Sequence, residues 1–222
     1  MNKVLGIIAI FFFLYYAQSA QAQNENSSLD TRVNLLFGLN QPIFANGFNV
    51  EGNFFYKRLA FDYSHGVLLD FSGNTVSGEL ADQQLKVHMP YTTGFGVGYR
   101  FNHWFNLRLE PKWHRFEISY DSDTPLEIEE EIVSYNTFSL GVGAYVNWCP
   151  FAKKTNALNG IMVAPSIRYW PRISSSLNGN EFTYDNRLTG QTETHEAMQA
   201  GINNTPFIFN VSVGYSLPIK KK

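Results

Sequence analysis

Charged side chains recur at every second position in the segment LRLEPKWHR, residues 107–115. One parity carries Arg108, Glu110, Lys112 and His114, and the other carries Leu107, Leu109 and Trp113. If this segment is a strand, side chains of one parity lie on one face of the sheet. An acid between two bases can then pair with charges on neighbouring strands. The chemistry that this pattern predicts is ion pairing on one face of a sheet.

A second candidate places a nucleophile beside a base, in Tyr63-Ser64-His65. Neighbouring residues of a strand point to opposite faces, so Ser64 and His65 cannot form the hydrogen-bonded dyad that activates a serine. Ser64 shares the parity of Asp62 instead. We therefore expect no enzymatic activity, and a lipid-A-modifying esterase is the least favoured function for this chain.

An acidic run could bind a hard cation, since Ca²⁺ and Mg²⁺ prefer several carboxylate oxygens. Residues 126–131 include Glu127, Glu129, Glu130 and Glu131. The spacing matches no dedicated calcium loop, so a weak cation-binding loop and a solvated charge run both remain open. Five histidines without ligand spacing and one cysteine, Cys149, predict neither a metal centre nor a cofactor. The net charge of −2 does not favour nucleic acid as a partner.

The first 22 residues have the three parts of a secretory signal peptide. Lys3 is basic, residues 4–17 are apolar, and Ala20-Gln21-Ala22 has the small residues of a cleavage site. The apolar run is shorter than the roughly 20 residues of a membrane-spanning helix. We expect cleavage after Ala22, with residues 23–222 forming a single domain.

Alternation with a period of two residues runs through most of that domain, which predicts half-buried strands. In TTGFGVGYRF, Phe95, Val97, Tyr99 and Phe101 alternate with Gly94, Gly96, Gly98 and Arg100. Eight such segments lie near residues 31–40, 48–56, 59–71, 91–101, 104–120, 134–148, 160–172 and 206–217. Connections are short at one end, whereas long loops are expected at 72–90, 121–133 and 173–205. This rule predicts an antiparallel up-and-down meander.

The two faces of the predicted strands differ in composition. Large aromatic residues dominate one face, and the other carries Gly, Ser, Asn and Thr with seven charges: Glu51, Asp62, Arg100, Arg108, Glu110, Lys112 and Arg168. A transmembrane barrel places its apolar face outward against lipid. Ions enclosed in a barrel must be paired. We therefore predict an eight-stranded transmembrane β-barrel with at least two acid–base contacts within this interior set. Pro111 and Pro165 fall within strands and predict bulges.

Charge is distributed unequally between the two expected ends. The three long loops, counted together with Asp70 at their rim, hold 13 of the 19 acidic residues. The short-turn end and the tail hold basic residues: Lys57, Arg58, Lys153, Lys154 and residues 220–222.

These features, together with the strands GFGVGYRF and FNVSVGYSL, resemble the small eight-stranded outer-membrane barrels of the OmpA-transmembrane-like and OmpX-like group. The resemblance implies a monomer in the outer membrane of a Gram-negative envelope, in contact with lipids and lipopolysaccharide, and inserted by the barrel-assembly machinery. Members of that group end on an aromatic residue, whereas this sequence ends LPIKKK. The expected role is structural or surface-interacting, with an interior filled by paired charges and acidic extracellular loops. The alternative is a narrow channel or carrier for small solutes.

Overall fold

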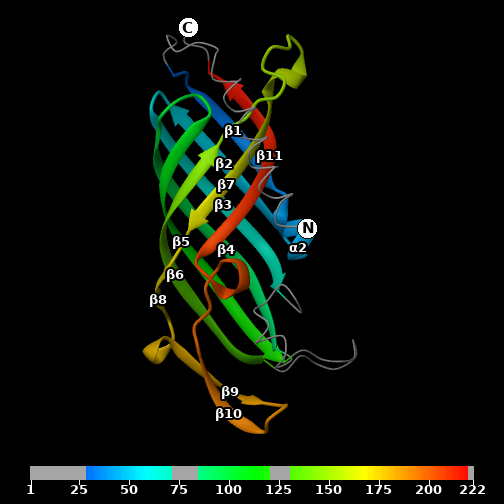
Figure 1. Ribbon diagram of the computed structural model, residues 1–222, viewed down its shortest axis with the longest axis vertical. Coiled ribbons are helices and arrows are strands. Elements are labelled where there is room, and N and C mark those ends of the chain that lie inside the picture. Colours follow the sequence, from blue (N-terminus) through cyan, green and yellow to red (C-terminus); the bar gives the residue numbers. More distant parts are fainter. Residues whose placement is uncertain (1–28, 72–84, 121–130, 220–222) are drawn as a thin grey trace, which may run out of the picture.

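The computed structural model describes residues 29–71, 85–120 and 131–219 (Figure 1). The expected signal peptide, residues 1–22, lies outside this part of the chain. The strands are β1 (Arg32–Gly38), β2 (Phe48–Tyr56), β3 (Leu59–Phe71), β4 (Leu85–Arg100), β5 (Phe105–Tyr120), β6 (Glu131–Val146), β7 (Ile161–Tyr169), β8 (Arg172–Ser175), β9 (Glu181–Asn186), β10 (Gln191–Glu196) and β11 (Phe207–Pro218). Helix α2 (Asn40–Phe44) and the 3₁₀ turns η2 (Ala157–Gly160), η3 (Asn178–Asn180) and η4 (Ile202–Asn204) connect them. No helix in the described ranges has the length and apolarity needed to cross a membrane.

Eight of these strands pair in a closed antiparallel ring. The order β5-β4-β3-β2-β1-β11-β7-β6 returns to its start through the pairing of β5 with β6. Each of the eight strands therefore has two neighbours, and the ring leaves no free edge along its paired length. The predicted all-β, antiparallel, up-and-down fold is confirmed.

The number of strands was underestimated. The structure has eleven strands in its described part, because β9, β10 and all but the first residue of β8 fall within the expected loop 173–205. Strand β8 pairs with β6, and β9 and β10 form a separate two-stranded sheet. This hairpin lies at the opposite end of the molecule from the short turns (Figure 1).

The prediction of bulges at Pro111 and Pro165 was wrong. The β4–β5 register is the same before and after Pro111, with Gly94 opposite Lys112 and Val97 opposite Leu109. The β7–β11 register also runs unchanged through Pro165. Proline lacks an N–H donor, but its fixed φ fits an extended strand. Each proline therefore removes one hydrogen bond to a neighbouring strand without shifting the register.

Outward and inward side chains differ sharply in the ring. Leu109 is 53% exposed on the outer surface, whereas the adjacent Glu110 is 0% exposed inside. Strand β2 shows the same strict alternation, with Glu51 and Asn53 buried between exposed Val50 and Phe54. In this part of the molecule, the apolar face is outside and the polar face is inside.

Strand β5 reverses this polarity along its length. Its inward side chains change from Arg108, Glu110 and Lys112 to Phe116, Ile118 and Tyr120. Its outward side chains change from Leu107, Leu109 and Trp113 to Arg115, Glu117 and Ser119. The change falls between Trp113 and Arg115. Beyond this point the strand has the polarity of an ordinary soluble protein.

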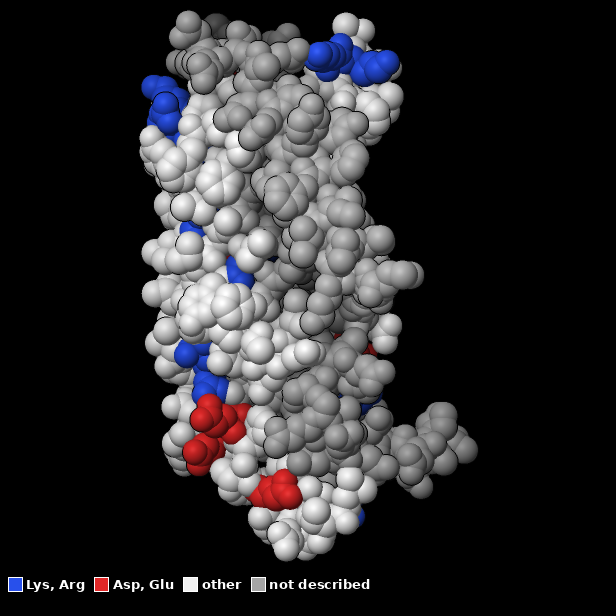
Figure 2. Space-filling model, in the orientation of Figure 1, with Lys and Arg blue, Asp and Glu red and all other residues white. Residues whose placement is uncertain are grey.

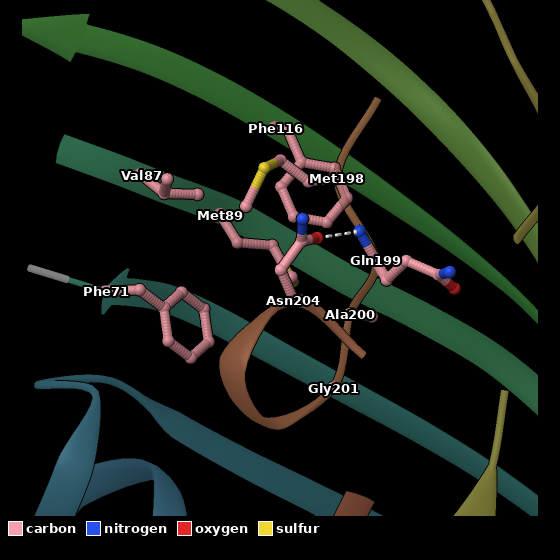
Figure 3. A pocket seen from close by; sticks show the side chains of 9 residues that line it. All are labelled: Phe71, Val87, Met89, Phe116, Met198, Gln199, Ala200, Gly201 and Asn204. Atoms are coloured by element: carbon pink, nitrogen blue, oxygen red, sulfur yellow. Dashed lines mark hydrogen bonds between the residues drawn. The ribbon is translucent and has the colours of Figure 1, made fainter. Parts of the chain in front are cut away.

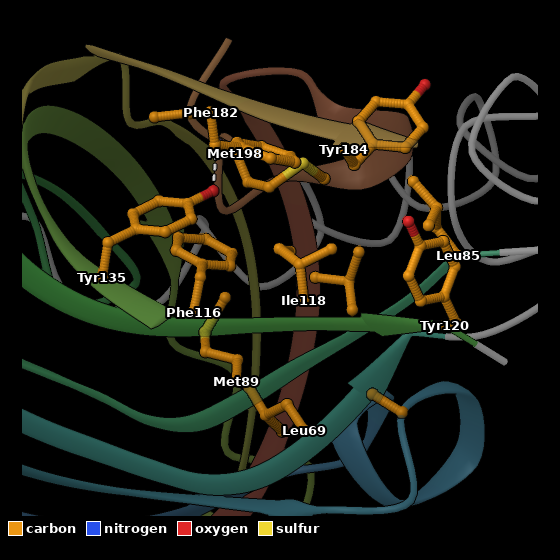
Figure 4. Close-up of a cluster of buried hydrophobic side chains, with 13 residues drawn as sticks. Leu69, Leu85, Met89, Phe116, Ile118, Tyr120, Tyr135, Phe182, Tyr184 and Met198 are labelled. Carbon is orange, nitrogen blue, oxygen red and sulfur yellow. Dashed lines mark hydrogen bonds between the residues drawn. The ribbon is translucent and has the colours of Figure 1, made fainter. Parts of the chain in front are cut away.

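An apolar core fills the loop end of the molecule, where the polarity is reversed (Figure 4). It joins the inner faces of β4, β5 and β6 to Phe182 and Tyr184 of β9 and to Met198. The backbone N–H of Met198 donates to the Tyr135 hydroxyl at 2.8 Å. The segment expected as a long loop therefore folds back over this end and packs against it.

Candidate functional site

Arg108 lies at the centre of a charge layer inside the ring. Its Nη1 atom is 2.6 Å from Glu51 Oε1 and 3.2 Å from Asp62 Oδ2. Its remaining donors reach Asn106 Oδ1 at 2.7 Å and Asn53 Oδ1 at 3.3 Å. These partners come from β2, β3 and β5, so one guanidinium links strands on both sides of the ring.

Two further cations complete the layer. Arg168 Nη2 lies 3.3 Å from Glu51 Oε2, and Lys112 Nζ lies 3.9 Å from Asp62 Oδ1. Lys112 also donates to Ser64 Oγ at 2.5 Å. The structure thus brings five of the seven predicted interior charges into one network of four acid–base contacts.

Glu110 differs from the expectation that it pairs with a base. It is buried, but in the described part of the chain it makes no ion-pair contact within 4.0 Å. The Tyr145 hydroxyl donates to its Oε1 at 2.5 Å, and Trp170 Nε1 donates to its Oε2 at 2.9 Å. Neutral donors therefore satisfy both of its oxygens.

Arg100 also departs from the predicted set, because it lies at the short-turn end of β4. Its Nη1 atom donates to the backbone oxygens of Asp30 and Lys57 at 2.9 Å each. Its Nη2 atom lies 3.6 Å from Asp30 Oδ1. Arg100 binds the segment that precedes β1 and takes no part in the Glu51–Arg108 network.

Aromatic rings pack against the cations of the charge layer. The Arg108 guanidinium lies 3.8 Å from the Tyr145 ring centroid, and that of Arg168 lies 5.0 Å from it. The Trp170 ring lies 5.1 Å from Lys112 Nζ and 5.2 Å from the Arg168 guanidinium. Such contacts add attraction where the cation is shielded from water.

Sequence reasoning missed Tyr145 and Trp170 as parts of this site. Tyr145 shares the inward parity of Gly141 and Gly143, which is a signal that could have found it. Trp170 follows the end of β7, so strand parity could not place it. Its side chain fits inside because a Cβ at Gly141 would lie 2.2 Å from Trp170 Cδ1.

The large interior side chains also depend on a second glycine. A Cβ at Gly96 would lie 2.1 Å from Asp62 Oδ2. Any larger residue there would displace the carboxylate from its position beside Arg108. The small residues of the GFGVG segment therefore make room for charges from neighbouring strands.

The arrangement favours a structural role for these charges over catalysis. Three acids and three bases (Glu51, Asp62, Glu110; Arg108, Lys112, Arg168) balance within the layer. A serine beside a lysine has the parts of a nucleophile and a base. However, Ser64 and Lys112 are both buried inside the ring, and His65 lies on the opposite face of β3. Ser64 is 5% exposed and Lys112 is 1% exposed.

Three of the four residues of the expected cation-binding loop, Glu127, Glu129 and Glu130, lie outside the described part of the chain. Glu131 begins β6 and is exposed. Within the ranges that are described, no three His, Cys, Asp or Glu side chains are grouped to hold a metal ion.

Two smaller features lie at opposite ends of the ring. At the loop end, a small pocket is lined mainly by apolar side chains that include Phe71, Met89, Phe116 and Met198 (Figure 3). At the short-turn end, burial raises the pKa of the Cys149 thiol, although Arg32 Nη1 lies 4.0 Å from its sulfur. The thiol is therefore protonated at neutral pH.

Comparison with solved structures finds distant structural likenesses. No family model and no curated protein matches the chain. Two structures of Ail, the attachment invasion locus protein of Yersinia pestis, are 12% and 13% identical, with TM-scores of 0.40 and 0.41; one of them holds the heparin analogue sucrose octasulfate. Each covers 85% of this chain and 100% of Ail.

A third structure, a major outer membrane protein from Thermus thermophilus, is 11% identical with a TM-score of 0.46. The alignment covers 85% of this chain and 98% of the Thermus protein. At this level of similarity, the likenesses do not indicate what the chain does.

Proposed function

We propose that this protein is an outer-membrane β-barrel that crosses the bilayer with β1–β7 and β11 and has a structural or surface-interaction role. The reversal of polarity along β5 is the observation that carries this proposal. An apolar band on the outside of a closed ring is favourable in lipid and unfavourable in water. The reversal at Trp113–Arg115 therefore marks the boundary between lipid and water.

Aromatic residues support the same boundary on other strands. Outward rings at the level of the reversal contact one another, with centroids 6.0 Å apart for Phe95 and Trp113 and 5.2 Å apart for Trp113 and Phe138. A second group lies at the short-turn end, where Tyr99 and Phe105 flank Phe101. Two such girdles are typical of membrane-spanning barrels.

The height of the apolar band also fits a membrane. From Phe105 to Trp113, β5 rises about 27 Å along its axis, or about 20 Å across a bilayer at the usual strand tilt. Outer-membrane barrels have an apolar band about 25 Å tall. The closed ring also gives every spanning strand two partners, as a backbone in hydrocarbon requires.

The charge layer supports a closed barrel over a channel. Eight strands leave an interior just wide enough for side chains. Here Arg108, Lys112, Arg168, Tyr145 and Trp170 occupy it. On this proposal the barrel is a monomer without catalytic activity, is exported by residues 1–22, and presents its acidic loops to lipopolysaccharide or a partner.

Expression of the full chain in a Gram-negative host tests the membrane assignment. We expect the protein in the outer-membrane fraction, with unheated and boiled samples that migrate differently on a denaturing gel. Recovery as a soluble protein with no heat-dependent shift would overturn the proposal.

Planar-bilayer recordings separate the closed barrel from the alternative of a narrow channel. We expect no stable openings from the wild-type protein or from the outward control Arg115→Gln. Stable openings that change with Arg108→Gln or Glu110→Gln would favour the channel.

A further inference from the structure

Basic side chains collect at the short-turn end of the ring, away from the acidic end (Figure 2). The β2–β3 turn carries Lys57 and Arg58, and the connection between β6 and β7 carries Lys153 and Lys154. All four are exposed. In the ring order, β2 and β3 lie four places from β6 and β7, so the two basic pairs lie on opposite sides of the same end.

These four cations have no carboxylate partner among the described residues. The ion pairs described at this end all use Asp30, which contacts Arg32, Arg100 and His103. Arg58 Nη1 donates to the backbone oxygen of Phe101 at 3.3 Å, which leaves its charge uncompensated. The end therefore presents positive charge that the described fold does not neutralise.

The basic residues lie beside the aromatic girdle of the same end. Lys57 Nζ lies 5.5 Å from the Tyr56 ring centroid, and the Arg58 guanidinium lies 5.8 Å from that of Tyr99. Both rings belong to the exposed outer face. Because Tyr and Trp girdles sit at the level of lipid headgroups, cations beside them lie among headgroup phosphates.

We propose that the short-turn end is a docking surface for anionic phospholipid headgroups, held by Lys57, Arg58, Lys153 and Lys154. The inference rests on the proposed membrane insertion and adds a lipid preference to it. Two contacts on opposite sides of the ring hold its end level in one leaflet. The loop end does not suit the same partner, because β9 and β10 carry Glu181, Asp185, Glu193 and Glu196.

Spin-labelled lipids measure this preference directly in the reconstituted full-length protein. The association of labelled phosphatidylglycerol is compared with that of labelled phosphatidylcholine in phosphatidylcholine vesicles. We expect phosphatidylglycerol to be preferred severalfold, up to about fivefold where a lipid meets one cation, and the preference to fall with added salt.

Two half variants and their combination locate the preference. We expect each half variant to lose part of the preference for phosphatidylglycerol; these variants are Lys57→Gln/Arg58→Gln and Lys153→Gln/Lys154→Gln. The quadruple variant should lose nearly all of it. The matched control, Lys86→Gln/Arg115→Gln, removes two cations from the loop end and should keep the preference for phosphatidylglycerol.

The outcomes distinguish this inference from the proposed function. Equal association of the two lipids with the wild-type protein, or a preference that survives in the quadruple variant, contradicts the docking surface while the barrel stands. If neither lipid shows a motionally restricted population, the protein does not meet lipid at all and both proposals fail.

Discussion

Arg108 connects more of the interior than any other side chain described in the charge layer. It contacts Glu51, Asp62, Asn53 and Asn106 and packs on Tyr145. Removing one member of a buried ion pair leaves the other charge without compensation. The stability of the ring therefore depends on Arg108 through the carboxylates that it holds.

Arg108→Gln is expected to lower the free energy of unfolding by about 3–5 kcal/mol, the usual cost of breaking a buried pair. Glu51→Gln should lower the free energy of unfolding less in the Arg108→Gln background than in the wild-type protein. In that background, no Arg108 charge is left without its partner. Urea unfolding in detergent micelles measures the double-mutant cycle. Arg115→Gln, on the outer face of the same strand and 38% exposed, should cost about 0–1 kcal/mol. Equal costs for Arg108 and Arg115 would contradict the network.

Sequence reasoning at the residue scale predicts faces better than partners. Alternation placed Arg108, Lys112 and Arg168 on the polar face of their strands, and the composition of the two faces predicted that this face lies inside. Parity does not fix the height of a residue in the ring. Arg100 therefore meets Asp30 at the end of the ring, and Glu110 meets the neutral donors of Tyr145 and Trp170.

At the scale of elements, β5 serves two environments in one strand. Its first half carries apolar residues outside and charges inside, and its second half has the opposite arrangement. The second half needs a cover for its apolar inner face. The β9–β10 hairpin provides that cover through Phe182, whose ring centroid lies 6.1 Å from that of Tyr135.

Phe182→Ala should therefore loosen the loop end without opening the ring. Loss of a buried Phe side chain costs about 3–5 kcal/mol where neighbours cannot relax. We expect faster amide hydrogen exchange in residues 181–196 and little change in β1, β2 and β11. Leu188→Ala, in the exposed turn of the same hairpin, is the control and should alter neither. Faster exchange throughout the ring after Phe182→Ala would show that the two parts unfold together.

This hairpin was not predicted from sequence for a physical reason. Strand β9 has two buried aromatic residues, Phe182 and Tyr184, and β10 reads QTETHE with no apolar face. A strand that packs through its partner alone carries no alternation signal. The ring strands bury one face along their whole length, so their period of two residues is easy to detect.

At the scale of the whole molecule, a closed ring joins two ends of opposite charge. The balanced charge layer occupies its interior, and the apolar core with the hairpin covers the loop end (Figures 1 and 4). The central claim is that the outer surface of the ring meets lipid and its interior does not. Two tryptophans test both halves of this claim, because Trp113 is 42% exposed outside and Trp170 is 5% exposed inside.

Quenching by lipids brominated in their acyl chains tests the claim most directly. The chain has four tryptophans, and each of two variants keeps one of them, Trp113 or Trp170, with the other three changed to Phe. In reconstituted vesicles, we predict strong quenching of Trp113 and almost none of Trp170. Quenching of Trp170 equal to that of Trp113, or quenching of Trp113 by aqueous iodide alone, would contradict the account.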